Sequence, residues 1–225
     1  LMRFMPYNVH WCVDNDGVYD LDRVAAVINA EDPDAVGVQE LHRGTSVFAD
    51  DQPAELARRT HREVCYYPVM RGCPTDPDGP GTYGIAVLTR LPVVASAVQA
   101  FPRGSGYSRS QEPRGALAVR LRCGVWFVNT HFGCDLTGYE QAAAVPVLVD
   151  FVDSTCGDAS AVVVGDFNAF PWRSSTLALR RRWVDAWTLY GAEGYFAGCT
   201  MPSWCPIERI DYVFLRRGAR QQLQI

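Results

Sequence analysis

Short apolar runs of strand length alternate along this chain with longer stretches of helical periodicity, and turn residues separate them. Residues 21–30 repeat apolar side chains at helical spacing, whereas Ala161 to Val164 form an unbroken apolar run that indicates a buried strand. Some strand runs are separated by a helix and others by a tight turn only. This mixture predicts a layered α/β protein with mixed β-sheets and not a purely parallel, doubly wound sheet.

The expected strands cover residues 3–7, 35–39, 83–89, 91–97, 116–121, 125–130, 161–164 and 210–215. The expected helices cover residues 21–30, 53–63 and 137–154, the last with a kink at Pro146. Two segments rich in glycine, 72–81 and 102–113, are expected to form surface loops. Because strands follow both loops closely, neither is a domain linker, and residues 1–225 are expected to form a single domain.

All 21 basic residues are arginines, and the sequence contains no lysine. Mechanisms that need a Schiff-base, phosphate-loop or kinase lysine are therefore excluded. The net charge of -4 does not indicate a nucleic-acid partner, although an enzyme that contacts a few phosphates stays compatible with it. No apolar run is long enough for a transmembrane helix, and no G-x-S-x-G motif suggests an esterase nucleophile.

The eight cysteines contain no C-x-x-C spacing, which argues against zinc ribbons and thioredoxin-type chemistry. Cys65 with Cys73, and Cys199 with Cys205, are spaced for local disulfides in an oxidising compartment. Buried free thiols are an equally good interpretation. The sequence leaves both open, and it predicts neither the compartment nor the oligomeric state.

Polar side chains follow the apolar strands at five places. They are Asn8, the pair Gln39 and Glu40, the run from Asn129 to His131, Asp166 with Asn168, and Asp211. Each alone is most simply a turn or cap residue, but ligands of open α/β sheets collect at strand ends. The joint set of carboxylates, amides and one imidazole suits Mg²⁺, which takes one or two carboxylates plus water and substrate phosphate. The absence of a histidine cluster speaks against zinc.

Seven segments carry a family resemblance. They are Tyr7–Val9, Val38–Leu41, Tyr83–Arg90, Glu112–Leu117, Val128–Phe132, Gly165–Ala169 and Arg209–Phe214. In this order they resemble the endonuclease/exonuclease/phosphatase superfamily, which includes pancreatic-type deoxyribonuclease, abasic-site endonucleases, neutral sphingomyelinases and inositol-phosphate 5-phosphatases. The resemblance covers nearly the whole chain, and Val-Asn-Thr-His and Gly-Asp-Phe-Asn are its most specific parts.

The resemblance implies a four-layer α/β sandwich, with two mixed β-sheets flanked by helices. It also implies a divalent-metal-dependent hydrolase of phosphate esters that uses Mg²⁺, with Mn²⁺ as a substitute. Carried over to this sequence, Glu40 would be the principal metal ligand, and Asn8 would help to place the metal or its water.

The same resemblance assigns the remaining site residues. Asp166 would orient and activate the attacking water, and Asn168 and His131 would hydrogen-bond the phosphoryl oxygens. Asp211 would orient a second histidine. Arg114 is a candidate phosphate contact, with an ion pair at a strand edge as the plainer alternative.

One feature departs from the family. The family usually ends with a strand and a Ser-Asp-His segment whose histidine pairs with the position of Asp211, and no Ser-Asp-His occurs here. We expect that this C-terminal strand and segment are missing from the sequence, so that the 225-residue form is weakly active or inactive and a longer form is active. The alternative is a catalytically impaired module that binds a phosphate ligand or a protein.

The substrate stays open among DNA, RNA, sphingolipid, phosphoinositide and small phosphodiesters. Four tryptophans bear on this question, because they either line a lipid- or base-stacking surface or pack in the core. They are Trp172, Trp183, Trp187 and Trp204.

Overall fold

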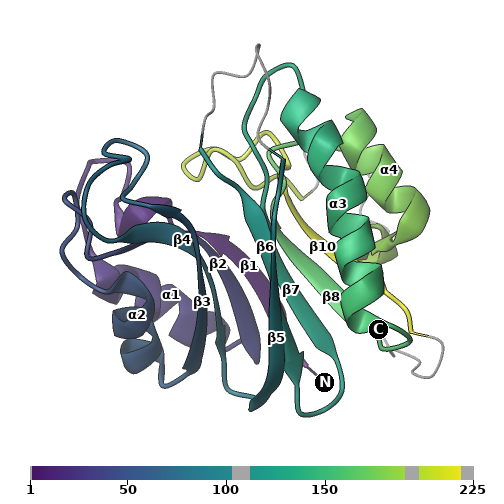
Figure 1. The fold of residues 1–225 in the computed structure, drawn as a ribbon, viewed down its shortest axis with the longest axis horizontal. Coiled ribbons are helices and arrows are strands. Elements are labelled where there is room, and N and C mark those ends of the chain that lie inside the picture. The colour runs from purple at the N-terminus through teal and green to yellow at the C-terminus, as the bar shows by residue number, and fades with distance from the viewer. Residues whose placement is uncertain (1, 103–111, 191–197, 219–225) are drawn as a thin grey trace.

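Two β-sheets pack face to face, and a pair of helices covers the outer face of each (Figure 1). The structure is a computed structural model that describes residues 2–102, 112–190 and 198–218. In chain order its elements are β1 (Phe4–Asn8), η1 (His10–Cys12), α1 (Leu21–Glu31), β2 (Ala35–Arg43), α2 (Gln52–Thr60), β3 (Glu63–Arg71), β4 (Thr82–Thr89), β5 (Val93–Ala100), β6 (Gly115–Leu121), β7 (Trp126–His131), α3 (Tyr139–Cys156), β8 (Ala161–Asp166), α4 (Ser174–Arg182), β9 (Val184–Asp185), η2 (Ala186–Tyr190) and β10 (Asp211–Arg216). The predicted four-layer α/β sandwich is confirmed.

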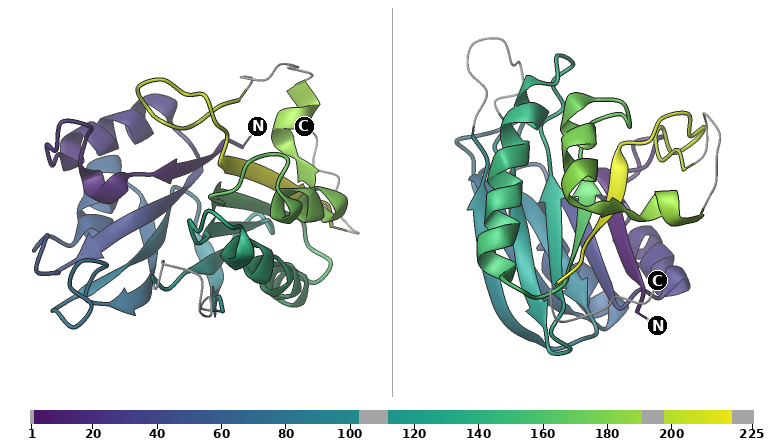
Figure 2. Two further views of the ribbon diagram at one scale, coloured as in Figure 1. Left: turned by 90° about the horizontal axis from the view of Figure 1, so that it is seen from above. Right: turned by 90° about the vertical axis from the view of Figure 1, so that its right-hand side faces the viewer.

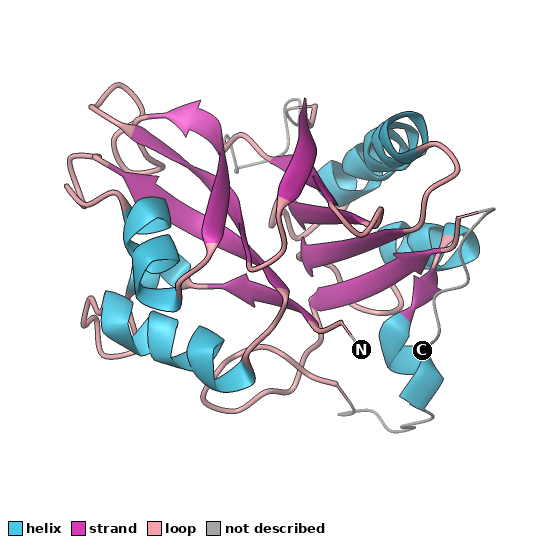
Figure 3. Cartoon of the chain, turned by 90° about the horizontal axis from the view of Figure 1, so that it is seen from below, coloured by secondary structure: helices cyan, strands magenta, loops and turns pink. Residues whose placement is uncertain are grey.

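The first sheet has the strand order β1-β2-β4-β3. Strands β1 and β2 run parallel, from the pair Phe4 and Ala35 to the pair Asn8 and Gln39. The other two pairings, β2 with β4 and β3 with β4, are antiparallel. Helices α1 and α2 cover the outer face of this sheet (Figure 3).

The second sheet has the order β5-β6-β7-β8-β10-β9. Here β7 and β8 are the parallel pair, in register up to His131 opposite Asp166, and the other neighbours are antiparallel. Both sheets are therefore mixed, as predicted. Seen from above, β1 of the first sheet and β10 of the second lie side by side (Figure 2).

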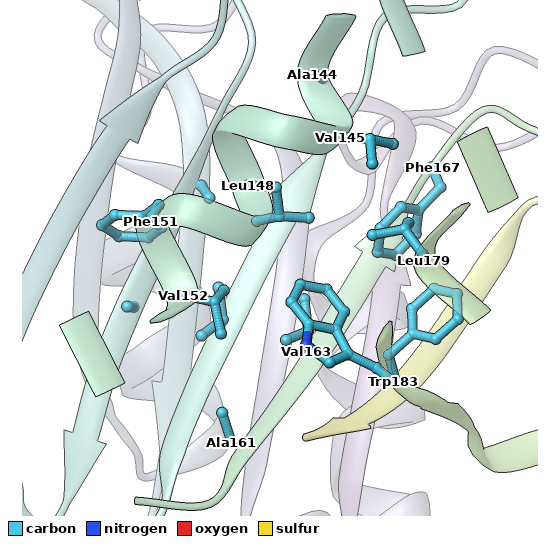
Figure 4. Packing of buried hydrophobic residues seen from close by; sticks show 14 of the residues in the cluster. Ala144, Val145, Leu148, Phe151, Val152, Ala161, Val163, Phe167, Leu179 and Trp183 are labelled. Carbon is cyan, nitrogen blue, oxygen red and sulfur yellow. The ribbon is translucent and has the colours of Figure 1, made fainter. Parts of the chain in front are cut away.

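The unbroken apolar run of β8 is explained by burial on both faces of its sheet. Val162 and Val164 point into the layer between the two sheets. Val163 points the other way and packs beneath α3 and α4, near Leu148 and Trp183 (Figure 4). A strand covered on both faces needs apolar side chains at every position, and each such side chain contributes about 1.5–3 kcal/mol when fully buried.

Several boundaries differ from the sequence-based prediction. The helix expected over 53–63 is α2, which ends at Thr60, and Glu63 instead begins strand β3, which was not predicted. Strand β3 is half-exposed, lies at the edge of its sheet and contains Pro68, so its apolar pattern is weak. Helix α4 and the short strand β9 were also not predicted.

Other predictions are confirmed or lie partly outside the described residues. Helix α3 continues through Pro146, and β6 and β7 form the expected hairpin. Most of the loop expected at 102–113 lies outside the described residues.

All eight cysteines are free thiols, so neither of the two candidate disulfides is formed in this structure. Within the described part of the chain, no helix combines the length and the apolar character that a membrane crossing requires.

Candidate active site

The two parallel strand pairs end at the same edge of the molecule, and their last residues meet there. Asn8 ends β1 and Glu40 lies in β2, while His131 ends β7 and Asp166 ends β8. The Asn8 side chain links the two sheets, because its Nδ2 donates to Glu40 Oε1 at 2.8 Å and to Asp166 Oδ2 at 3.1 Å. Nε2 of His131 lies 3.9 Å from Glu40 Oε1 and 3.8 Å from Asp166 Oδ2.

Two of the site residues have a left-handed backbone. Glu40 has φ of 65°, and the register of β2 against β4 shifts between Val38 and Leu41. Asn168, just beyond β8, has φ of 46°. Such conformations cost on the order of 1–3 kcal/mol for a non-glycine residue and concentrate at functional sites. The shift in register interrupts the alternation of side chains along β2, so the Glu40 side chain points in a direction that a regular strand would not give it.

A glycine is required immediately before Asp166. Gly165 has φ of 149°, and a Cβ atom there would overlap the backbone oxygen of Thr130 on the neighbouring strand. The tight approach leaves Asp166 with both carboxylate oxygens bonded. Its Oδ1 accepts from the backbone N–H of Asn168 at 2.8 Å, and its Oδ2 accepts from Asn8.

A second carboxylate lies beside Asp166. Asp211 begins β10 and is the register partner of Asp166 across the antiparallel pair. Burial raises the pKa of Asp166 to about 7, and the negative charge of Asp211 adds to that shift. Burial likewise raises the pKa of Asp211 to about 6, against a hydrogen bond with Thr200. Because burial and the neighbouring negative charge disfavour the ionised form of Asp166, a cation bound beside the two carboxyl groups would be favoured.

A cavity of about 610 Å³ opens beside this carboxylate pair. Asn8, Asp166 and Asp211 line this cavity together with Thr200 to Ser203. The site therefore faces a space large enough for a small organic ligand.

The histidine side of the site is held by hydrogen bonds. Nη1 of Arg114 lies 2.6 Å from Nδ1 of His131, and Nδ2 of Asn168 lies 3.2 Å from its Nε2. Asn168 Nδ2 also donates to the backbone oxygen of Phe132 at 3.0 Å. Burial, followed by the positive charge of Arg114, holds the pKa of His131 well below its usual value.

Two buried amide side chains beneath the site join the two sheets, and the sequence analysis assigned them no role beyond their position at strand ends. Gln39 Nε2 donates to Asn129 Oδ1 at 2.5 Å, and Asn129 Nδ2 donates to the backbone oxygens of Val38 and Ala86. Gly37 allows this approach, because a Cβ atom there would lie 2.7 Å from the Asn129 side chain. A sequence signal for such a pair is a polar residue inside an otherwise apolar strand, because a buried polar side chain needs a hydrogen-bond partner.

The structure therefore brings six sequence-predicted residues together. They are Asn8, Glu40, His131, Asp166, Asn168 and Asp211. Arg114 lies next to them and is ion-paired with Glu112 at 2.8 Å. Of the four tryptophans, Trp183 is part of the core, whereas Trp172, Trp187 and Trp204 are exposed.

The donor set fits a hard divalent cation that keeps part of its water shell. Among the described residues, no three His, Cys, Asp or Glu side chains are grouped closely enough to enclose a metal ion. Zinc sites are usually built from such closed sets, but Mg²⁺ commonly binds through one or two carboxylates with water completing its shell. Glu40 and Asp166, tied together through Asn8, supply carboxylates of that kind.

The sequence profile of the Endonuclease/Exonuclease/phosphatase family matches residues 7–223. The chain belongs to this family. Endonuclease/exonuclease/phosphatase proteins are typically metal-dependent hydrolases of phosphate esters. No curated protein matches the chain.

Solved structures of family members have the same fold. An endonuclease/exonuclease/phosphatase from Beutenbergia cavernae is 26% identical with a TM-score of 0.80, over 96% of this chain and 64% of that one. This chain thus spans less than two thirds of that relative. A mannosyl-6-phosphatase from Bacteroides thetaiotaomicron is 16% identical, with a TM-score of 0.71 over 96% and 85% of the two chains. The human Nocturnin catalytic domain with bound sulfate is 18% identical, with a TM-score of 0.68 over 95% and 81%.

Proposed function

We propose that this protein hydrolyses phosphate esters with a divalent metal ion, Mg²⁺, as its cofactor. The observation that carries the proposal is the meeting of carboxylates and N–H donors from both sheets at one point. Nε2 of His131 lies within 4 Å of Glu40 and Asp166, and Nδ2 of Asn168 is 3.2 Å from the same ring nitrogen. An anionic ester needs both kinds of group, a cation held by carboxylates and donors for its oxygens.

Glu40 and Asp166 would hold the metal, and the amide of Asn8 would keep the two carboxylates in place. When bound, a divalent cation supplies positive charge that offsets the charge of the phosphate. Asn168 and His131 would hydrogen-bond the phosphoryl oxygens as negative charge develops on them. Asp166 would also orient the attacking water, since its carboxylate is fixed by two hydrogen bonds.

A second candidate function is a binding module that recognises a phosphate ligand or a protein without cutting it. The observation that favours it is the position of Asp211. Asp211 makes no ion pair with any arginine or histidine among the residues that the structure describes, and its recorded side-chain partner is Thr200. The second histidine that the resemblance places beside this carboxylate has no counterpart there.

The test is a metal titration of phosphate-ester hydrolysis by the wild type and by Glu40→Gln. Chromogenic mono- and diesters are assayed with Mg²⁺ and with Mn²⁺, after chelation of bound metal. We expect Mg²⁺-dependent turnover in the wild type and a loss of about 10³-fold in Glu40→Gln, because removing a metal ligand costs several kcal/mol of transition-state stabilisation.

Glu63→Gln is the matched control, because Glu63 is exposed at the opposite end of the first sheet. It should keep the wild-type rate. A wild-type protein that turns over no ester, yet binds inorganic phosphate equally with and without Mg²⁺, would instead establish the binding module. Equal rates in the wild type and Glu40→Gln would refute the proposed metal site.

A further inference from the structure

Arg114 contacts Nδ1 of His131, and the other ring nitrogen, Nε2, faces Glu40 and Asp166. Arg114 directly precedes β6, and Gly115 is the register partner of His131, so the arginine reaches the ring from the side. Its Nη1 approaches His131 Nδ1 to 2.6 Å and Glu112 Oε1 to 2.8 Å. The side chain of Arg114 is only 9% exposed, which leaves these two partners to determine its direction.

The chemistry of the guanidinium decides which nitrogen of His131 carries the proton. A guanidinium has five N–H donors, no acceptor, and does not deprotonate in proteins. Nδ1 of His131 must therefore accept the hydrogen bond from Arg114 with its lone pair. A neutral imidazole with an accepting Nδ1 has its proton on Nε2, the nitrogen that faces Glu40 and Asp166.

The Asn168 amide then presents a second donor toward the same point. Its Nδ2 donates to the Phe132 backbone oxygen. This hydrogen bond sets the orientation of the amide, so that Nδ2 of Asn168, and not Oδ1, lies next to His131. Nε2 of His131 and Nδ2 of Asn168 are 3.2 Å apart, and neither accepts from the other if both carry hydrogen. Two N–H groups in this arrangement both need an acceptor, and an oxygen of an anionic ligand provides it.

We propose that Arg114 is a positioning residue that holds His131 as the Nε2–H tautomer, so that the ring donates to a phosphoryl oxygen and does not act as a base. The proposal rests on the proposed phosphate-ester hydrolysis for the identity of the acceptor, but the tautomer itself is a property of the free protein. In this proposal Arg114 acts on His131, and the competing role for Arg114 is direct contact with the substrate phosphate.

Glu112 supports Arg114 in this role. Its carboxylate is largely buried beside the guanidinium, where burial raises the pKa of Glu112 and the Arg114 charge opposes that shift. Removal of Arg114 alone would leave a buried carboxylate without its partner, which is strongly destabilising. The informative variant is therefore the double change Arg114→Met with Glu112→Gln, compared with Glu112→Gln alone.

The first measurement is long-range ¹H–¹⁵N NMR of the histidine rings in metal-free protein. The chain has four histidines, so His131→Gln assigns the signals of His131. We expect the Nε2–H tautomer in the wild type and in Glu112→Gln, and its loss or mixing in the double variant. A wild-type His131 that carries its proton on Nδ1 overturns the proposal, and this result needs no variant to fold. An unchanged tautomer in a folded double variant also overturns it.

The second measurement separates positioning from direct phosphate contact. If hydrolysis is present, the double variant should lose about 10²-fold in kcat relative to Glu112→Gln, with KM and inhibition by inorganic phosphate little changed. A rise in KM and weaker phosphate inhibition with an intact tautomer would assign Arg114 to the substrate and overturn the proposal. Arg120→Met, at an exposed position of β6, is the control. If no ester is turned over, the NMR result still decides the tautomer, so failure of the proposed function is distinguishable.

Discussion

On one side of the site His131 lies between Arg114 and Asn168, and on the other side Asp166 lies against a second carboxyl group, Asp211. On the histidine side, hydrogen bonds within the protein hold the ring and the Asn168 amide in place, and an N–H group of each is directed at the same point. On the carboxylate side, two acidic groups lie next to each other, and burial raises the pKa of both. The difference indicates that one side is pre-organised to receive oxygen atoms, while the other gains stability when a cation arrives.

The largest effect should follow from changing the carboxylate side. Asp166→Asn retains the shape of the side chain but removes its charge, so we expect Mg²⁺-dependent kcat to fall by about 10³-fold and the half-saturating Mg²⁺ concentration to rise. Steady-state kinetics over a range of Mg²⁺ concentrations measures both. Asp158→Asn, at an exposed position before β8, is the matched control. A rate within tenfold of the wild type would show that the reaction does not depend on this side.

A smaller effect is expected from loosening the support of the histidine side. Asn129→Leu removes three buried hydrogen bonds, two of them from Asn129 Nδ2 to the backbone oxygens of Val38 and Ala86. We expect a loss of roughly 2–4 kcal/mol in the free energy of unfolding. Urea denaturation gives this value. Asn29→Leu, at an exposed position of α1 where the side chain donates to the backbone oxygen of Arg59 at 3.2 Å, should cost only about 1 kcal/mol. Equal losses in the two variants would mean that the buried amides do not tie the sheets together.

The smallest effect is a pH dependence of the carboxylate side in the absence of metal. The folded-state pKa of Asp211 is raised from 3.8 to about 6, so the unfolded chain releases this proton first as pH rises. The stability of the wild type should therefore fall between about pH 4 and pH 7 through this group. The Asp211→Asn variant has no titrating group at this position. Its free energy of unfolding should therefore fall less than that of the wild type over the same pH range, by at least ~1 kcal/mol.

Urea denaturation in EDTA at pH 4.5 and pH 7.5 measures this difference, and the comparison between variants removes the titration of other groups. Saturating Mg²⁺ should reduce the wild-type slope, because a bound cation favours ionised carboxylates. Parallel pH dependences in the wild type and Asp211→Asn would show that the folded-state pKa of Asp211 is not raised. The contrast between the two sides of the site would then fail.

Much of the fold was predictable, because its strongest signals are local. The apolar run of β8 and the periodicity of α1 and α3 predicted elements that the structure contains. Strand β3 was missed, since an edge strand that is half-exposed and contains Pro68 has no clear apolar pattern. Its existence depends on pairing with β4, a contact between segments that the sequence places apart.

The site was predictable in its members but not in its contacts. Strand-end polarity and motif resemblance identified Glu40, His131 and Asp166, and the His131 ring lies within 4 Å of both carboxylates. The roles assigned to them stay predictions, as does the requirement for a further C-terminal segment. The link through Gln39 and Asn129 was not foreseen, because a hydrogen bond between strands of different sheets has no local signature.

The chemical groups at the ends of the strands follow from the order of apolar runs and polar residues along the chain. The partners of these groups follow from the pairing of strands in the folded molecule. Arg114 meets His131 because β6 pairs with β7, and Asp211 meets Asp166 because β10 pairs with β8. Strand pairing sets which side chains become neighbours, and in a buried site the neighbours determine protonation, hydrogen bonding and the need for a cation.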